Sequence, residues 1–292
     1  TLIMSQRDEW LSEMEAAAQA AAKDTGINLT TQDANSDTSK MIQYIESSVT
    51  AGEDAIIINM VDPETAAQCI EAAGDVPVVF VNRFPGDPSV LNEKAVYVGS
   101  DEMTSGAFQG EFLAKFFKDQ GKTDISYLML NGILGQTSTT NRTASVLKAL
   151  EDNGIKATAA AAPLAADYDR ATAMDMISPL LKTTKYDCII SNNDAMALGA
   201  VEAMQQQGLD PKSVPIVGID ATADGRQAIK DGTLAMTVFQ NAEGRASLQA
   251  AANLIDGKPI AEGTGYEVDD ENEFIIWVPF EPVTIDNVAD YD

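Results

Sequence analysis

The sequence predicts an α/β protein built on parallel sheets. Short apolar runs rich in Val and Ile alternate with segments of helical periodicity along the whole chain, which is the pattern of repeated βαβ units. The chain has 292 residues, well above the ~150 residues of an average domain. Two domains of similar size and one large α/β domain both fit that length.

Six segments have the composition of buried strands, and helices are expected between them. The segment 8–26 starts with acidic residues and ends at a glycine, and the segment 37–52 places its apolar residues on one face. Both are interpreted as amphipathic helices that cross over between strands. The apolar residues of the second helix are Met41, Ile42, Ile45 and Val49. The six strands are 55–60, 76–82, 125–130, 188–192, 214–220 and 234–240.

A strand–helix–strand pattern occurs twice in the chain. "EDAIIINMVD", a helix and "VPVVFVN" match "YDCIISNNDA", a helix and "VPIVGID". Asn59 then corresponds to Asn192 and Asn82 to Asp220, each at the carboxyl end of its strand. Ligands of open α/β sheets bind at that edge, so we expect a ligand site there. A chance similarity between Val-rich and Ile-rich strands is the alternative.

Polar side chains occupy four of the predicted junctions between a strand and the next helix. An Asn or Asp at such a junction can cap the helix, and capping or turn formation is the favoured interpretation of Asn192. For the four together, a converging group is favoured over four independent caps. The four are Asp8, Asn82, Asn193 and Asp220.

A converging group of this kind fits a sugar. Carboxylates and carboxamides present planar forks that span neighbouring hydroxyls, and an Arg adds fixed donors. The apolar C–H faces of a monosaccharide pack on aromatic rings, for which Trp10 and Tyr168 are candidates. Core packing is the alternative interpretation of both rings.

Charge and composition exclude several classes of function. Lys and Arg total 19 against 45 Asp and Glu, a formal net charge of -26, so nucleic acid is not an expected partner. The absence of histidine excludes Ser-His-Asp and Cys-His nucleophiles and removes the commonest transition-metal ligand. No apolar run approaches the ~20 residues of a membrane span. Cys69 and Cys188 are expected to be buried thiols in different domains rather than a disulfide.

Six motifs distributed over nearly the whole chain carry a family resemblance. They are "NMVDPETA", "VPVVFVNRFP", "YVGSDEMTSGAFQGEFLAKF", "SNNDAMALGAVEAM", "VPIVGIDA" and "DGTLAMTVFQNA". These motifs resemble the periplasmic glucose/galactose-binding proteins, and more broadly the ribose-binding-like solute receptors of ABC importers. "NNDAMALGAVEA" is the specific signal, whereas "VGIDA" also recurs in the effector domains of lactose-repressor-like regulators.

The resemblance implies the periplasmic binding protein type I fold: two Rossmann-like lobes with parallel sheets flanked by helices. The lobes would be joined by three chain crossings, near residues 100–105, 240–243 and 277–280. A sugar would be held in the cleft between the lobes, with hinge closure around it. The expected N-terminal lobe is 1–102 with 242–277, and the expected C-terminal lobe is 103–241 with 278–292.

The resemblance also implies roles for individual residues. In the first lobe, Asp8 and Asn82 would bind sugar hydroxyls and Trp10 would be a stacking platform. Gln240, at the second crossing, stands where the family has an Asn that touches the sugar. The second lobe would contribute Arg142, Tyr168, Asn193 and Asp220.

The sequence departs from the family pattern at the sugar site. Gln136 and Ser138 stand where the family carries a His and an Asp, while Arg142 is retained. Gln can still donate and accept, but Ser removes a negative charge and has a shorter reach. Trp10 replaces a Phe and Tyr168 replaces a Trp. A glucose-like or galactose-like hexose is expected, although these exchanges leave a different pyranose or a pentose open.

No calcium ion and no other cofactor is expected. The glucose/galactose receptors carry an EF-hand-like calcium loop, but the corresponding "FFKDQGKTDISYLML" lacks the D-x-[DN]-x-[DN]-G pattern. Asp187 occupies the position of one distal carboxylate ligand, and a single ligand makes no cage. The acidic run 269–273 lacks the same spacing and is interpreted as a solvated loop.

The favoured hypothesis is a monomeric, non-enzymatic, extracytoplasmic receptor that delivers a monosaccharide to an ABC permease, with a chemoreceptor as a further partner. We expect the numbered chain to be a trimmed mature form, either free in a periplasm or anchored by lipid. The effector domain of a lactose-repressor-like transcriptional regulator is the alternative, but it needs a basic helix-turn-helix where this chain is acidic. An enzyme is the third class, with Asp8 and Asp220 as the candidate acid/base pair and no dinucleotide or P-loop motif.

Overall fold

The computed structural model describes residues 1–240 and 243–291. The chain divides into two compact units. Unit 1 comprises Thr1–Ser100 with Asn241–Pro279, and unit 2 comprises Asp101–Gln240 with Phe280–Asp292. These boundaries lie within two residues of the expected lobe boundaries. Residues 241 and 242 of the expected crossing at 240–243 lie outside the described residues.

Unit 1 is built on a six-stranded sheet with the strand order β12-β5-β4-β3-β1-β2. Every neighbouring pair in it is parallel. Polar residues that follow β1, β3 and β4 therefore share one edge of the sheet. The strands are β1 (Leu2–Met4), β2 (Thr31–Asp33), β3 (Ile56–Ile58), β4 (Val78–Val81), β5 (Ala95–Gly99) and β12 (Ile275–Trp277).

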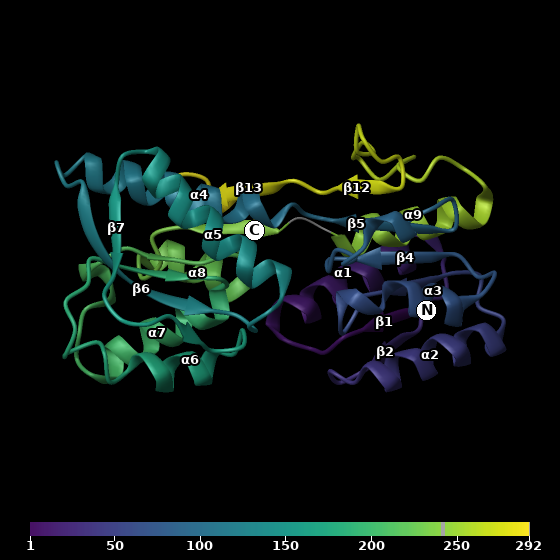
Figure 1. Ribbon diagram of the computed structural model, residues 1–292, viewed down its shortest axis with the longest axis horizontal. Coiled ribbons are helices and arrows are strands. Elements are labelled where there is room, and N and C mark those ends of the chain that lie inside the picture. Colours follow the sequence, from purple (N-terminus) through teal and green to yellow (C-terminus); the bar gives the residue numbers. More distant parts are fainter. Residues whose placement is uncertain (241–242, 292) are drawn as a thin grey trace. The chain divides into compact units, whose positions relative to one another are not determined.

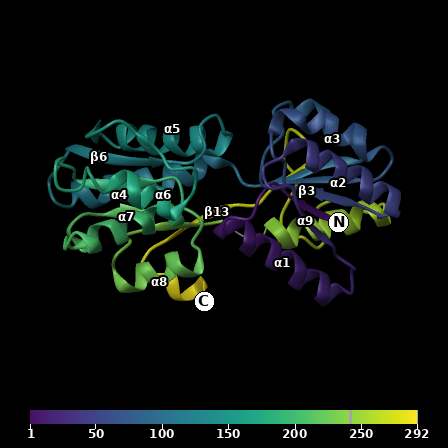
Figure 2. The same ribbon diagram turned by 90° about the horizontal axis from the view of Figure 1, so that it is seen from below.

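Helices cover both faces of this sheet, which is why its inner strands β1, β3 and β4 are apolar on both sides. Figure 2 shows α1 (Glu9–Thr25) and α9 (Glu243–Asp256) on one face, and α2 (Thr38–Ala51) and α3 (Ala66–Ala73) on the other. The core is accordingly split into two clusters. Leu11, Met14 and Leu248 belong to the first, and Met41, Ile45 and Cys69 belong to the second.

Unit 2 repeats the same layering. Its sheet has the order β10-β9-β6-β7, with β8 also paired to β6. Figure 1 shows α4 (Glu102–Lys118) and α5 (Thr137–Asp152) on one side of β6, and α6 (Arg170–Ile177) and α7 (Asp194–Gln206) on the other. A further helix, α8 (Ala223–Asp231), packs with α7. The strands are β6 (Asp124–Asn131), β7 (Lys156–Ala159), β8 (Leu164–Ala165), β9 (Cys188–Ser191) and β10 (Ile216–Val217).

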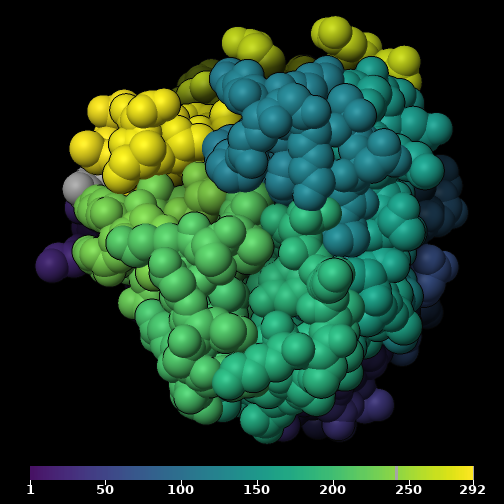
Figure 3. Space-filling view, turned by 90° about the vertical axis from the view of Figure 1, so that its left-hand side faces the viewer, coloured from purple at the N-terminus to yellow at the C-terminus, as the bar shows by residue number. Residues whose placement is uncertain are grey.

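The last predicted strand pairs differently from the expectation of parallel sheets. β11 (Thr237–Gln240) runs antiparallel to β13 (Phe280–Val283). Isolated parallel bridges join Asp220 to Phe239 of β11 and Val217 to Met236, the residue before β11. The C-terminal segment, yellow in Figure 3, lies on the surface of unit 2. The ring of Tyr291 packs 4.9 Å from that of Phe239 and its hydroxyl donates to Glu281 (2.7 Å). β13 therefore reaches β11 from a distant part of the sequence, which a local pattern cannot predict.

The predicted fold class is confirmed: both units are α/β, with parallel sheets between helices. Each of the six predicted strands overlaps an observed strand, and the two predicted amphipathic helices are α1 and α2. Cys69 and Cys188 are buried free thiols in different units, and burial raises the pKa of Cys69 to about 11. No helix in the described part of the chain is both long enough and apolar enough to span a membrane.

Close packing of α4 against α5 depends on glycine. A Cβ added at Gly110 would lie 2.6 Å from both the Cβ of Ala149 and the carbonyl oxygen of Val146. Gly110→Ala should therefore lower the free energy of unfolding by about 1–3 kcal/mol through overpacking, as measured by urea denaturation. Glu111→Ala, an exposed change on the same helix, is the control and should stay within about 0.5 kcal/mol of the unsubstituted protein. Equal stability of the two variants would contradict the packing described.

Candidate functional site

In each unit a buried asparagine follows one of the two central strands, β3 in unit 1 and β9 in unit 2. The side chains of Asn59 and Asn192 are fully buried. The Oδ1 of Asn59 accepts the backbone N–H of Ser5 (3.2 Å), and the Oδ1 of Asn192 accepts the backbone N–H of Gly132 (3.1 Å). Ser5 directly follows β1 and Gly132 directly follows β6. The two asparagines thus make the same contact, which supports the internal repeat seen in the sequence.

The next strand of each half also ends in a shared feature. Asn82 has a φ of 66° and Asp220 has a φ of 115°. Non-glycine residues with positive φ are uncommon and are tolerated where surrounding structure fixes them. The backbone N–H of Asn82 donates to Val98 (3.0 Å), and that of Asp220 donates to Val238 (2.8 Å). Both side chains are therefore held at the carboxyl edge of their own sheet.

Three consecutive residues after β9 have three different roles. The interpretation of Asn192 as a cap is wrong, because its side chain ties β6 to β9 and also contacts Thr143. Asn193 is the cap of α7: its Oδ1 accepts from the backbone N–H of Met196 (3.0 Å). Asp194 is completely buried, and its carboxylate accepts from the Thr237 hydroxyl (2.6 Å).

Asp8 is also a helix cap, since its Oδ1 accepts the backbone N–H of Leu11 (2.8 Å) at the start of α1. Its Oδ2 accepts from the side chain of Gln6 (3.1 Å). Two of the four junction residues, Asp8 and Asn193, are thus caps, and Asn82 and Asp220 are not. Capping occupies one oxygen of the Asp8 carboxylate and leaves lone pairs on the other, so it orients the group without preventing a ligand contact.

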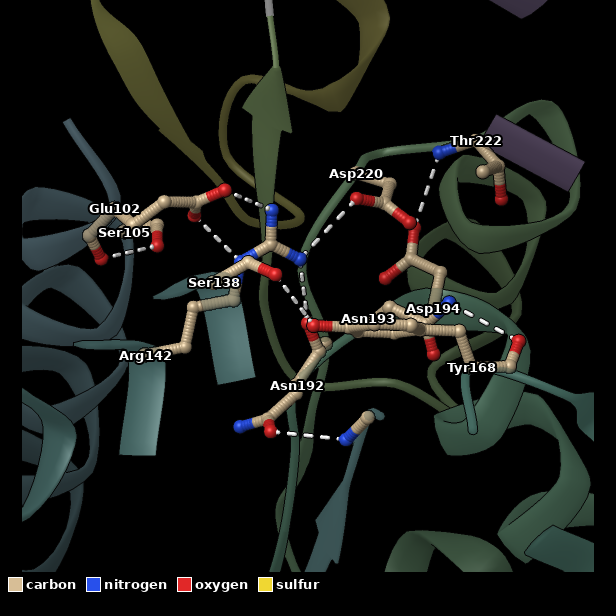
Figure 4. Close-up of polar contacts among 12 residues, drawn as sticks. Glu102, Ser105, Ser138, Arg142, Tyr168, Asn192, Asn193, Asp194, Asp220 and Thr222 are labelled. Atoms are coloured by element: carbon tan, nitrogen blue, oxygen red, sulfur yellow. Dashed lines mark hydrogen bonds and ion pairs between the residues drawn. The ribbon is translucent and has the colours of Figure 1, made fainter. Parts of the chain in front are cut away.

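Arg142 lies at the centre of the polar cluster of unit 2 (Figure 4). It is 4% exposed. Its Nε and one terminal nitrogen donate to the two carboxylate oxygens of Glu102 (2.6 and 3.0 Å), and the other terminal nitrogen donates to the carbonyl of Asn192 (2.7 Å). The same nitrogen lies 3.7 Å from an oxygen of Asp220. The guanidinium therefore connects α4 with the segments that follow β9 and β10.

Electrostatics keep this junction charged. Burial by itself would lower the pKa of Arg142, but the surrounding negative groups, Glu102 first, outweigh burial and raise it above its ordinary value. Most of the Arg142 donors are already used within the protein, so its expected role as a sugar donor is accompanied by a structural one. Sequence reasoning missed Glu102, because an acidic residue at a helix start normally indicates only a favourable dipole interaction.

Tyr168 is anchored by two hydroxyls. Its own hydroxyl lies 2.7 Å from that of Ser138 and 2.8 Å from that of Thr139. Burial raises the pKa of Tyr168, so the phenol stays neutral. A Cβ at Gly132 would lie 2.0 Å from the ring, so only glycine fits beneath it. Ser138 thus bonds to the Tyr168 hydroxyl, and the Nδ2 of Asn193 donates to the Tyr168 carbonyl (3.4 Å).

The remaining predicted site residues are Gln136, Gln240 and Trp10. Gln136 is half-buried at the start of α5 and makes no side-chain capping bond there. Gln240 is buried at the end of β11. Trp10 is half-buried and packs against the core cluster beneath α1, so core packing accounts for part of its ring. The structure thus joins Ser138, Tyr168 and Asn193 in one chain of contacts, and Arg142 and Asp220 in another.

Asp187 is engaged by a lysine. The ammonium of Lys122 donates to one carboxylate oxygen of Asp187 (2.5 Å), and the backbone N–H and hydroxyl of Ser126 donate to the other (2.7 and 3.1 Å). Burial would raise the pKa of Asp187, but these bonds lower it. No group of three or more potential metal-ligating side chains occurs among the described residues. The absence of calcium stays a prediction. In the acidic run 269–273, the carboxylate of Asp269 accepts a hydrogen bond from the indole N–H of Trp277 (2.8 Å).

Comparison with known proteins identifies the family. The periplasmic binding protein domain matches residues 1–259. The chain belongs to the periplasmic binding protein family. It is 34% identical to the D-galactose/methyl-galactoside binding periplasmic protein of Haemophilus influenzae, over 97% of this chain and 88% of that protein. This bears out the resemblance seen in the sequence motifs.

Two further relatives extend the comparison. A putative rhizopine-binding protein of Rhizobium meliloti is 32% identical over 91% of this chain and 82% of its own length. An ABC transporter solute binding protein from Bacillus halodurans, solved with bound myo-inositol, is 29% identical with a TM-score of 0.82 and covers 99% of this chain and 95% of that one. This periplasmic binding protein is thus similar over more than 90% of its length to binding proteins whose names or bound ligands include different polyols.

Arg142→Met should lower the free energy of unfolding by about 3–5 kcal/mol, because Glu102 would be left buried and unpaired. Arg142→Met combined with Glu102→Leu should recover most of that loss, since apolar residues can replace a buried ion pair. Urea denaturation of the full chain measures both. Arg170→Met, at a quarter-exposed arginine paired with Glu202 and Asp224, is the control and should cost about 1 kcal/mol or less. A double variant no more stable than the single one would contradict the burial of an obligatory pair.

Proposed function

We propose that this chain is an extracytoplasmic receptor that binds a monosaccharide and delivers it to an ABC permease. One observation carries the proposal: the two repeated sheets each end in an Asn or Asp held at positive φ, Asn82 and Asp220, with a capping Asp8 or Asn193 at the neighbouring junction. Such planar groups suit neighbouring hydroxyls. The family membership and the names of the relatives support the same conclusion.

The sugar is proposed to contact both units at once, as the resemblance implies. Each unit alone offers only part of a hydrogen-bonding shell for a polyol. A ligand that bonds to both units stabilises the arrangement in which they face it, and this differential affinity drives closure. The permease then recognises the closed receptor, and a chemoreceptor could do so in the same way.

A hexose of the galactose or glucose type is the proposed ligand. The relative from Haemophilus influenzae binds galactose by name. In this chain the Ser138 hydroxyl is bonded to Tyr168, so it contributes less to a ligand than a carboxylate would. Gln136 has no capping bond at the start of α5, and we infer that it supplies part of the discrimination between epimers.

The receptor is proposed to act without chemical transformation of its ligand. The relatives compared above are named as binding proteins. Arg142 is held charged by its carboxylate neighbours and Tyr168 is held neutral by burial, so neither is poised to exchange a proton near neutral pH. The protein is further proposed to work as a monomer outside the cytoplasm.

A panel of polyols tests the proposed ligand class. D-galactose, D-glucose, D-ribose, D-allose and myo-inositol would each be added to the full chain in a thermal unfolding experiment. A sugar present at 100 times its dissociation constant adds ~2.7 kcal/mol to stability and should raise Tm by about 5 °C or more. L-glucose is the control, because its mirror-image hydroxyls cannot meet the same partners. No shift with any member of the panel would contradict the proposal.

Individual carboxylates can be tested by calorimetry. Asp8→Ala and Asp220→Ala should each weaken binding of the best sugar by about 2–4 kcal/mol, because buried hydroxyls would lose charged partners. Asp54→Ala, an exposed change in unit 1, is the matched control and should leave affinity unchanged. Affinities equal to that of the control would mean that the sugar binds elsewhere.

A further inference from the structure

Asn59 is completely buried, and its side-chain contacts fix which of its two amide ends points in each direction. Its Oδ1 lies 3.2 Å from the backbone nitrogen of Ser5. A backbone N–H can only donate, so the atom facing it must be the amide oxygen. The hydroxyl of Ser5 donates to the same oxygen (2.6 Å). The orientation is therefore imposed by the main chain that leaves β1.

The partners of the amide nitrogen of Asn59 fix its orientation in the same way. The Nδ2 of Asn59 donates to the carbonyl oxygen of Val81 (3.3 Å), which can only accept. It also donates to the Oδ1 of Asn82 (3.1 Å). Because Asn59 can present only hydrogens on this side, Asn82 must present its oxygen to it. The amide of Asn82 is thereby oriented in turn.

Hydrogen bonds also hold the backbone of Asn82 in place. Its φ of 66° is held by a bond from its backbone N–H to Val98 and by the hydroxyl of Tyr97, which donates to its carbonyl oxygen (2.8 Å). The ring of Tyr97 packs edge-on against Phe84 and Trp277. Within the described residues the Nδ2 of Asn82 donates no hydrogen bond, and the side chain is half-buried. Its two hydrogens are available to a ligand.

We propose that Asn59 is a positioning residue that makes Asn82 a hydrogen-bond donor to the bound sugar. The proposal rests on the proposed function, in which Asn82 contacts the ligand. The proposal adds a direction to two contacts. The sugar oxygen that faces Asn82 must accept a hydrogen bond, whereas the sugar hydroxyls that face the carboxylate of Asp8 must donate one. Unit 1 therefore distinguishes between sugar hydroxyls by the direction of their hydrogen bonds as well as by their position.

The corresponding residue of unit 2 lacks this arrangement. Asn192 donates from its Nδ2 to the hydroxyl of Thr143 (3.2 Å). In Figure 4 its side chain points away from Asp220, and the connection between these two residues runs instead through Arg142. The repeat thus keeps the buried asparagine but uses its amide differently. Only in unit 1 does the buried amide orient a second amide.

Exchange of side-chain amide hydrogens with solvent tests the arrangement without any ligand. In the full chain labelled with ¹⁵N-asparagine, the carboxamide hydrogens of Asn59 should exchange at least tenfold more slowly than those of Asn82. Asn59→Asp presents only acceptors, so the amide of Asn82 should turn and donate to it, and its exchange should slow at least tenfold. Asn253→Asp is the matched control, because Asn253 is also buried in unit 1 and its side-chain hydrogen bonds are to Gln249, Ile260 and Glu262. Carboxamide hydrogens of Asn82 that are as protected as those of Asn59 in the unsubstituted protein would overturn the proposal.

Calorimetry with D-galactose gives the second readout. Asn82→Asp keeps an oxygen for Asn59 but removes the donor, so affinity should fall at least tenfold, whereas Asn253→Asp should stay within twofold. Unchanged affinity in Asn82→Asp would overturn the proposal, since an acceptor would then be sufficient. Failure of the unsubstituted protein to bind any sugar of the panel would count against the proposed function instead. The exchange experiment would still decide the orientation of Asn82 in that case.

Discussion

The carboxyl ends of the strands in each unit depend on one constraint: a buried amide must satisfy its donors and its acceptor. Asn59 and Asn192 meet it by accepting the backbone N–H that follows the neighbouring strand. An unpaired amide at a fully buried position would cost roughly 1–3 kcal/mol. These side chains therefore fix the spacing and direction of the strand ends, and through them the polar groups that the following loops present. The site is a consequence of how the sheet edge satisfies its own hydrogen bonds.

The two units reach the same edge geometry by different means. Unit 1 uses neutral groups in series, from Ser5 through Asn59 to Asn82. Unit 2 instead places the charged Arg142 between Glu102 and Asp220. Breaking a buried ion pair is strongly destabilising, so the polar groups that follow the strands of unit 2 are expected to depend more on a single contact than those of unit 1. Rigid, pre-oriented groups lose less entropy when a ligand binds.

Much of this architecture could be predicted from local sequence patterns. Val-rich and Ile-rich runs predicted the strands, and the repeated Asn at 59 and 192 predicted the sheet edge at which polar groups gather. What could not be predicted depended on partners distant in sequence. Glu102 and Arg142 pair across two helices, and β13 returns from the C-terminal region to β11. Neither pairing leaves a periodic signal.

The assignment of Asn192 as a cap failed for a related reason. Two asparagines and an aspartate stand side by side at residues 192–194, and composition cannot tell which of them faces a helix N-terminus. The one-residue difference between Asn192 and Asn193 reverses the direction of the side chain as the strand ends. The roles of Ser138 and Thr139 at Tyr168 likewise follow from a tertiary contact. Sequence identified the right kinds of group and left their partners undetermined.

The most direct test of the central claim is a crystal structure of the protein grown with the sugar that stabilises it most. The account predicts sugar oxygens within hydrogen-bonding distance of Asp8 and Asn82 from unit 1 and of Asn193 and Asp220 from unit 2. The amide nitrogen of Asn82 should face the sugar and its oxygen should face Asn59. A sugar bound away from these strand ends, or bound to one unit alone, would contradict the account.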